Sequence, residues 1–279
     1  MFAGQIHELK QAWAVSVLDK ELFVLPSSNS TQLNVYDAAD YTSHGFINIP
    51  ITSNNFVDMT ACGFYHCLYL ADSKQRWTNE NTRVVRLQLL PSKLNEWKVD
   101  DTINAVSVTS AHYLLALCGA VSEKLNLFTT DGVLHMTVEL QPDLMSVNSA
   151  MELMPGKFVV AHGKESRDLH RVCVVNRKGK VLRTYGRFQG SYRTLLSYPT
   201  DVAIDKDGFV YVVEEKCNRL IVLTSELDSV QCISDVLPVD DNWSCRGLKI
   251  DKDLRRIYVR SEVSSRRHRS ESCVTILEM

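Results

Sequence analysis

The sequence predicts an all-β fold, a six-bladed β-propeller built of four-stranded antiparallel blades. A short apolar strand recurs six times, at steps of 46, 46, 44, 52 and 47 residues, and its central residues are Phe23, Tyr69, Leu115, Val159, Tyr211 and Tyr258. A fixed period of this length is typical of a repeat architecture, because one unit cannot bury its own apolar faces whereas six arranged radially can. No segment has helical periodicity over a window of about 11 residues.

The fifth repeat displays the strands of one blade most clearly. Val202 and Ile204 are the apolar positions of a short strand between Asp201 and Asp205, and residues 205–208 read Asp-Lys-Asp-Gly, a hairpin turn in which Gly208 is free to adopt a positive φ. Residues 209–213, 220–223 and 230–233 supply three further strands. Four antiparallel strands within about 40 residues make a propeller blade.

We expect a single domain over residues 1–279. Its blades are predicted at approximately residues 11–50, 51–100, 101–142, 143–188, 195–236 and 243–279. The sixth repeat ends at its third strand, residues 274–277, and residues 2–9 precede the first repeat without an assignment. We therefore predict that this N-terminal strand closes the last blade, which removes an open sheet edge.

Composition favours a soluble protein in a reducing compartment. Hydrophobic residues make up 45% of the chain, and no apolar run approaches the roughly 18 residues that span a bilayer. The N-terminus has no secretory pattern, so we expect a cytoplasmic protein that does not contact membranes, with its eight cysteines as thiols. Cys62 and Cys67 flank a four-residue turn and are predicted to face each other across a hairpin.

The fifth blade resembles an NHL repeat. The matching stretches are Pro199 to Asp205, Val210 to Glu214 and Cys217 to Leu220, with departures at Glu214 and at Cys217-Asn218. The phrases MTAC…CLYLAD (59–72), FVVAHG…LHRVCVV (158–175) and YPTDVAIDKDGFVYV (198–212) together resemble the C-terminal propellers of invertebrate proteins of the tripartite-motif type. The resemblance covers nearly the whole chain.

This resemblance implies a recognition platform, since some members of the family bind single-stranded RNA and others present proteins for ubiquitination. Ubiquitin transfer requires a RING finger with zinc ligands, which this sequence lacks. We therefore expect a protein that is not an enzyme and that binds a protein or peptide partner on one propeller face, as the substrate-recognition part of a ubiquitin ligase system. Single-stranded RNA binding through the basic face of blades 4–6 is the first alternative.

Positive charge is concentrated in the second part of the sequence. Residues 1–156 hold 9 Lys and Arg against 16 Asp and Glu, whereas residues 157–279 hold 22 against 17. Basic side chains attract phosphate, and aromatic ones stack on bases or anchor peptides. The partner-binding candidates lie in the predicted interblade and long loops of blades 4–6, and they are Arg167, Arg187, Phe188, Tyr192, Arg193, Lys216, Arg219, Trp243, Arg246, Arg260, Arg266, Arg267 and Arg269. The sequence pI of about 6.4 is low for a dedicated nucleic-acid domain.

The second alternative is a metal-dependent hydrolase of the six-bladed propeller type, which needs polar side chains converging from the first strands of the blades. The polar members of these strands are Ser16, Asp58, Ser107, Glu152, Asp201 and Lys249. His162, His170 and Cys173 are placed at the two ends of a long loop in blade 4, where hydrogen bonding is favoured over metal binding. We predict no metal site, no cofactor and no catalytic residues.

Overall fold

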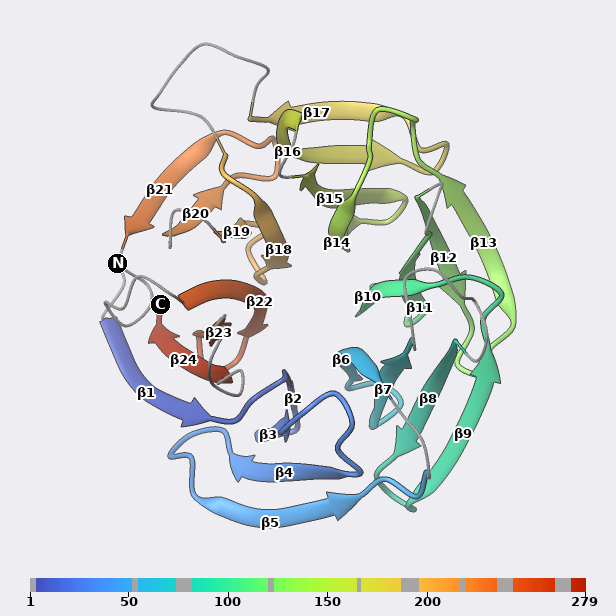
Figure 1. Cartoon of the computed structure of the whole chain (residues 1–279), viewed down its shortest axis with the longest axis vertical. Helices are drawn as coiled ribbons and strands as arrows, with labels where there is room; N and C mark the ends of the chain where they lie inside the picture. Colours follow the sequence, from blue (N-terminus) through green and yellow to red (C-terminus); the bar gives the residue numbers. More distant parts are fainter. Residues whose placement is uncertain are drawn as a thin grey trace. The chain divides into compact units, whose positions relative to one another are not determined.

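The computed structural model describes residues 4–51, 55–73, 82–119, 123–164, 167–186, 196–215, 219–234, 243–263 and 272–279. The regular structure in these ranges consists of 24 strands in six four-stranded antiparallel sheets, the blades of a β-propeller (Figure 1). The predicted fold class is therefore confirmed. No helix in the described ranges has the length and apolar character needed to cross a bilayer.

The chain divides into two compact units, and Trp13–Pro142 forms the one that holds blades 1–3. Each of blades 1–5 is a meander in which neighbouring strands in the sequence pair with each other. Blade 1 contains β2 (Ala14–Leu18), β3 (Glu21–Leu25), β4 (Gln32–Asp37) and β5 (Ser43–Asn48); blade 2 contains β6 (Phe56–Cys62), β7 (Cys67–Asp72), β8 (Arg83–Gln88) and β9 (Lys93–Lys98); blade 3 contains β10 (Ile103–Val108), β11 (Leu114–Cys118), β12 (Lys124–Phe128) and β13 (Leu134–Glu139).

The second unit joins Met1–Ala12 to Asp143–Met279 and holds blades 4–6. Blade 4 contains β14 (Val147–Met154), β15 (Lys157–Lys164), β16 (Arg167–Asn176) and β17 (Val181–Tyr185); blade 5 contains β18 (Pro199–Ile204), β19 (Val210–Glu214), β20 (Arg219–Leu223) and β21 (Ser229–Ser234); blade 6 contains β22 (Trp243–Asp251), β23 (Arg256–Val263), β24 (Ser272–Glu278) and β1 (Gly4–Lys10). The pairing of β1 with β24 runs from Gly4 opposite Glu278 to Lys10 opposite Cys273. The prediction that an N-terminal strand closes the last blade is confirmed, whereas the expectation of a single domain stays a prediction.

The apolar period of the sequence corresponds to the second strand of each blade. Its six central residues are all buried, and Tyr211, the most accessible of them, is 7% exposed. These strands are covered on both faces, so they are almost continuously apolar rather than alternating. The fourth strands β5, β13 and β21 are largely exposed and mix polar with apolar residues, and Phe46, Leu134 and Val230 are exposed apolar residues on them.

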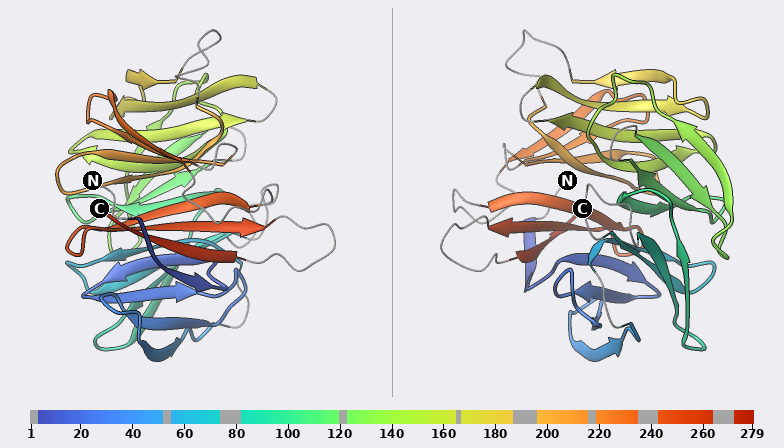
Figure 2. Two further views of the ribbon diagram at one scale, coloured as in Figure 1. Left: turned by 90° about the vertical axis from the view of Figure 1, so that its left-hand side faces the viewer. Right: turned by 45° about the vertical axis from the view of Figure 1, so that its right-hand side comes forward.

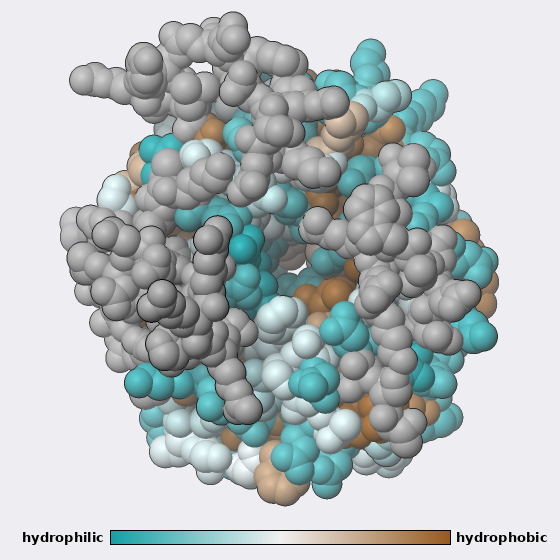
Figure 3. All heavy atoms as spheres, viewed as in Figure 1, coloured by the Kyte–Doolittle hydropathy of each residue, from teal (hydrophilic) through white to brown (hydrophobic). Residues whose placement is uncertain are grey.

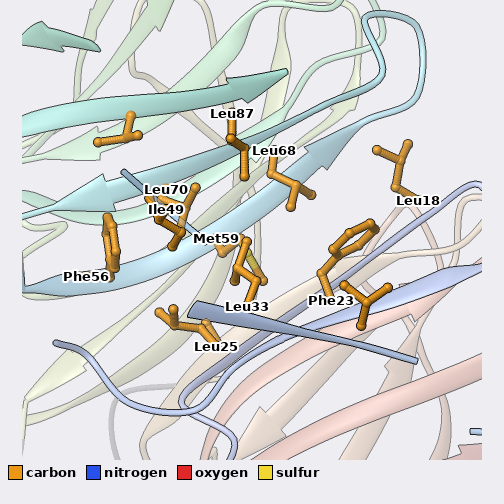
Figure 4. Close-up of a cluster of buried hydrophobic side chains, with 13 residues drawn as sticks. Leu18, Phe23, Leu25, Leu33, Ile49, Phe56, Met59, Leu68, Leu70 and Leu87 are labelled. Carbon is orange, nitrogen blue, oxygen red and sulfur yellow. The ribbon is translucent and has the colours of Figure 1, made fainter. Parts of the chain in front are cut away.

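Each unit buries its apolar side chains between adjacent blades. Figure 4 shows the cluster between blades 1 and 2, where Phe23 and Leu33 of blade 1 meet Met59 and Leu70 of blade 2. A second cluster joins blades 2 and 3, and two comparable clusters join blade 4 to 5 and blade 5 to 6. Because every blade buries its faces against a neighbour, the blade is not a separate folding unit.

The first strands of blades 2–6 share a β-bulge near their beginning. The pairing with the second strand skips one residue in each case, at positions 57, 104, 148, 200 and 246. A bulge bends the strand. In blades 2 and 5 the residue after the bulge is an aspartate, and Asp58 accepts the Val106 N–H at 2.9 Å while Asp201 accepts the Leu248 N–H at 2.7 Å, each from the first strand of the next blade.

Two hairpin turns with a glycine at positive φ differ in how closely a neighbour approaches that glycine. Gly132 in the β12–β13 turn has a φ of +83°, and a Cβ added there would lie 2.5 Å from the Trp97 ring of blade 2. Gly208 in the β18–β19 turn has a φ of +84°, and nothing lies within 4 Å of an added Cβ. Gly132 therefore carries two constraints and Gly208 only one.

We expect Gly208→Ala to reduce the free energy of unfolding by about 1 kcal/mol, the cost of a left-handed backbone with a Cβ. Gly132→Ala adds a clash with the Trp97 ring and is expected to cost roughly 2–4 kcal/mol in total. Urea denaturation of the two variants and the wild type measures the difference. Equal losses in the two variants would show that the Trp97 contact does not constrain the turn.

Candidate functional site

The structure describes the side chains of only three of the thirteen partner-binding candidates, namely Arg219, Arg246 and Arg260. The backbones of Arg167 and Trp243 are described, and these residues begin β16 and β22. The other candidates lie outside the described residues, and they are Arg187, Phe188, Tyr192, Arg193, Lys216, Arg266, Arg267 and Arg269. The partner-binding role of the set therefore stays a prediction.

Several candidates belong to strands rather than to loops, which corrects the placement inferred from the sequence. Arg167 lies in β16, Trp243 and Arg246 in β22, and Arg260 in β23. The charged sequence around these positions suggests a loop. However, Arg167, Trp243 and Arg260 each lie opposite a residue of the neighbouring strand, Arg260 for example opposite Gly247, and Arg246 is the bulge residue that the pairing of β22 with β23 skips. Sheet pairing satisfies their backbone groups, so charge in the side chain does not exclude a strand.

Arg246 is held between two carboxylates. Its Nη1 atom lies 2.9 Å from Glu215 Oε1, and its Nε atom donates to Glu262 Oε1 at 2.7 Å. Arg260 in turn donates to the backbone oxygen of Arg246. These contacts neutralise the charge locally and connect the end of blade 5 to the strands of blade 6.

A buried carboxylate at the end of the second strand pairs with an arginine at the start of the third strand in two blades. Asp72 is 1% exposed and accepts hydrogen bonds from Arg83 Nε at 3.0 Å and from the Asn55 N–H at 2.8 Å. Glu214 is fully buried and is bound by Arg219 and the Ser197 N–H in the same arrangement. Burying a charge is tolerated here because it is paired and hydrogen-bonded.

Blade 4 places a histidine at this position. His162 is 1% exposed, lies opposite Arg171, and its Nε2 atom accepts a hydrogen bond from Arg171 Nε at 3.0 Å. Burial, together with the charge of Arg171, lowers the pKa of His162 from 6.5 to about 4. The expectation that His162, His170 and Cys173 lie at the ends of a long loop is wrong, because β15 extends to Lys164 and β16 begins at Arg167.

The polar residues of the first strands, which the hydrolase alternative requires, have structural partners. Asp58 and Asp201 accept backbone N–H groups of the next blade, as described above, and Ser16 and Ser107 are buried. Within the described ranges no three His, Cys, Asp or Glu side chains are grouped so as to hold a metal ion. The Asp205 and Asp251 sequences form hairpin turns in which the carboxylates accept backbone N–H groups.

The β18–β19 and β22–β23 turns enclose a pocket of about 170 Å³ between blades 5 and 6. Both blades belong to the same unit, and they are drawn in orange and red in Figure 2. The pocket is lined by Asp205, Lys206, Asp207, Phe209, Tyr211, Val222, Val230, Gln231, Lys252, Arg255 and Met279. We refer to it as the blade 5–6 pocket.

The wall of the blade 5–6 pocket is apolar and held by a turn. Val222 is buried, and Val230 is 55% exposed although it is apolar. Tyr211 donates its hydroxyl to Asp205 Oδ2 at 3.0 Å, and Asp205 Oδ1 accepts the N–H groups of Asp207 and Phe209. Burial, and next the charge of Asp205, raises the pKa of Tyr211, which is therefore neutral.

The rim of the blade 5–6 pocket carries unneutralised positive charge. Lys206, Lys252 and Arg255 line it and form no ion pair with any described residue. This distinguishes them from Arg219 and Arg246, which bind carboxylates. Sequence reasoning missed this pocket because its walls come from turns and strands of two blades. The available signal was the pair of similar turns, Asp205-Lys206-Asp207 and Asp251-Lys252-Asp253.

No broad apolar patch is apparent among the coloured residues of the face shown in Figure 3. The coloured residues there are mostly hydrophilic or neutral, with small separated brown areas. A large exposed apolar patch would mark an interaction site. The blade 5–6 pocket combines an apolar wall with three cations that form no ion pair with a described residue.

Comparisons with known proteins show the fold class. No protein-family model and no curated protein sequence matches this chain. Among solved structures, a luciferin-regenerating enzyme matches with a TM-score of 0.68 and 11% identity, over 99% of this chain and 94% of its own. A protein of unknown function from Bacteroides caccae matches with a TM-score of 0.63 and 10% identity, over 86% of this chain and 81% of its own. The NHL and tripartite-motif resemblance stays a prediction.

The expectation that the chain is not an enzyme is corrected by these comparisons. The luciferin-regenerating enzyme shares the architecture over nearly the entire chain, so the propeller fold is compatible with catalysis. The expectation is based on the missing RING finger, which concerns ubiquitin transfer and no other reaction. Fold alone does not assign a function, and the site must do so.

The buried histidine of blade 4 predicts a pH-dependent stability. Unfolded His162 titrates near its ordinary value of 6.5 and the folded residue near 4, so the unfolded state binds more protons between these values. Stability is expected to fall by about 2–3 kcal/mol as the pH drops from 7 to 4. The neighbouring charged groups are Arg171, Asp143 and His170, and the effect is measured by urea denaturation across this range.

The His162→Glu variant gives blade 4 the carboxylate–arginine pair that blades 2 and 5 have. Its free energy of unfolding is expected not to show this fall above about pH 4.3, because the arginine keeps the carboxylate ionised. His135→Gln on the exposed surface of β13 is the matched control and should keep the wild-type profile. If the free energy of unfolding fell in parallel for the wild type and His162→Glu between pH 6.5 and 4, His162 would not be the source of the pH dependence.

Proposed function

We propose that this chain is a recognition propeller whose blade 5–6 pocket binds an acidic peptide segment of a partner protein. The observation that carries the proposal is the combination, in one pocket, of an apolar wall with three cationic side chains that form no ion pair with a described residue. The bound segment places one apolar side chain in the pocket and a carboxylate on its rim.

The size of the pocket supports a single side chain as the occupant. Pockets for drug-sized ligands measure about 300–1,000 Å³, whereas this one measures about 170 Å³. An apolar anchor residue fits such a space, and burying it against Val222, Phe209 and Met279 provides the main gain in free energy.

The charge on the rim supports an acidic sequence around that anchor. Lys206, Lys252 and Arg255 outnumber Asp205 and Asp207, and Asp205 already accepts three hydrogen bonds from its own turn and from Tyr211. Complementary charges accelerate association and suppress binding of basic sequences. The interaction is accessible to solvent, so it weakens with salt.

The resemblance to tripartite-motif propellers adds a context for this partner, namely a protein presented for ubiquitination. Single-stranded RNA binding through blades 4–6 remains an alternative prediction. Loss of binding on Arg266, Arg267 and Arg269 substitution by Glu, with a steep salt dependence, is its test. The described candidates Arg219 and Arg246 are bound to carboxylates, which favours the peptide over the RNA.

Catalysis on a small organic molecule is the second candidate, and the likeness to a luciferin-regenerating enzyme favours it. A panel of ester and lactone substrates, with and without added divalent cations, tests this candidate on the purified protein. Turnover that survives changes at Lys252 and Arg255 would assign the activity to another part of the chain.

We expect labelled octapeptides with a central Leu, Phe or Trp flanked by Asp and Glu to bind the wild-type protein in fluorescence polarisation. Peptides with the same anchor flanked by Lys and Arg should bind at least about tenfold more weakly. The double variant Lys252→Glu/Arg255→Glu is expected to lose about tenfold or more of its affinity for the acidic peptides, because it reverses the charge of the rim.

The matched control is Lys178→Glu/Lys180→Glu, which makes the same change of net charge on the exposed β16–β17 turn of the same unit. It should bind as the wild type does. Equal binding of acidic and basic peptides, or an unchanged affinity in the Lys252→Glu/Arg255→Glu variant, would refute the proposal.

A further inference from the structure

Two cysteines face each other at the base of the β6–β7 hairpin in blade 2. Cys62 and Cys67 are direct cross-strand partners, as predicted, and four turn residues join them. They are 2% and 0% exposed, and neither forms a disulfide. Residues directly opposite in an antiparallel pair have Cα atoms about 4.5–5.5 Å apart, within the range that a disulfide spans. A bond between them therefore requires no change of register.

The two thiols are not equivalent. They hydrogen-bond each other, and the guanidinium of Arg86 and the hydroxyl of Tyr69 lie beside Cys67. Arg86 also donates to Gln88 Oε1 at 2.7 Å, while its buried Nε atom has no other partner among the described residues. A cation beside a thiol stabilises the thiolate, the form that reacts as a nucleophile.

The electrostatics of the pair follow from these contacts. The hydrogen bond from Cys62 lowers the pKa of Cys67, and Arg86 lowers it further against the effect of burial. The hydrogen bond to Cys67, together with burial, raises the pKa of Cys62. Cys67 is therefore the nucleophile, and Cys62 keeps its proton.

The other buried cysteines with shifted pKa values lack this arrangement. Burial raises the pKa of Cys118, Cys173 and Cys245. Cys245 and Cys273 share one sheet but lie on β22 and β24, with β23 between them. Two strand spacings of about 4.8 Å place them too far apart for a disulfide.

We propose that Cys62 and Cys67 form a redox-active dithiol that hydrogen peroxide closes to a disulfide. The Cys67 thiolate attacks one peroxide oxygen, an S–O bond forms, the O–O bond breaks, and the leaving hydroxide takes up a proton to become water. The sulfur of Cys62 then attacks the sulfur of the Cys67 sulfenic acid, forming the S–S bond. The S–O bond breaks, and the departing hydroxyl leaves as water with the proton of Cys62. A small thiol reverses the closure by two-electron reduction.

The turn above the pair provides the route for peroxide. Phe64 is 65% exposed and stacks on His112 with ring centres 4.2 Å apart, and Tyr65 packs edge-on against Phe64. Closure of the disulfide links the two ends of this turn and restrains the aromatic side chains that it carries.

Non-reducing peptide mapping by mass spectrometry of the folded wild-type protein after peroxide treatment tests the proposal. We expect the linked Cys62–Cys67 peptide, with the loss of two hydrogen atoms and full reversal by dithiothreitol. Arg86→Gln is expected to slow the closure roughly tenfold, because it removes the cation that stabilises the thiolate. Arg177→Gln, an exposed arginine of blade 4, is the matched control and should close at the wild-type rate.

Trapping with dimedone separates the roles of the two cysteines. Cys62→Ser should yield a sulfenic acid adduct at Cys67, whereas Cys67→Ser should yield none at Cys62. The wild-type measurement does not depend on the folding of either variant. Oxidation of the exposed Cys232 while Cys62 and Cys67 stay reduced, or an adduct at Cys62 in Cys67→Ser, would overturn the proposal.

Discussion

Adjacent blades depend on hydrogen bonds that side chains near the start of one first strand make with the backbone of the next blade. Asp58 and Asp201 accept N–H groups, while Trp13 donates to the Phe56 oxygen at 2.7 Å and Asn148 donates to the Pro199 oxygen at 2.8 Å. Apolar packing between blades is strong but not directional. These polar contacts set the register of one blade on the next, since a buried amide without a partner costs about 1–3 kcal/mol.

The same end of the blade uses most of its charged groups for structure. Asp72, Glu214 and Arg246 bind oppositely charged side chains, and His162 accepts a hydrogen bond from an arginine. A partner that competed for these groups would leave buried charge unpaired, at a cost of several kcal/mol. The cations best able to bind a ligand are therefore those with no ion pair to a described residue, and the blade 5–6 pocket brings three of them together.

The sequence predicts the strands better than the site, and the reason is physical. Burial on both faces makes the second strands continuously apolar, so Phe23 and Tyr258 mark their blades without further information. Arg246 and Arg260 are charged and suggest loops, and only the pairing of β22 with β23 reveals that they belong to strands, Arg260 opposite Gly247 and Arg246 at the bulge. The blade 5–6 pocket depends on Lys206 and Lys252 being brought together by packing of two blades, which no local pattern encodes.

The first-to-second-strand hairpins lie at the end of each blade away from the interblade hydrogen bonds. Their residues can vary because the blade does not depend on them for its position, as the open surroundings of Gly208 demonstrate. The β6–β7 hairpin carries the dithiol, and the β18–β19 and β22–β23 hairpins carry the pocket. Function at these turns costs little stability, since loops tolerate variation that a packed sheet does not. The luciferin-regenerating enzyme shares the propeller fold with this chain at 11% identity, so the fold is retained while the residues on it differ.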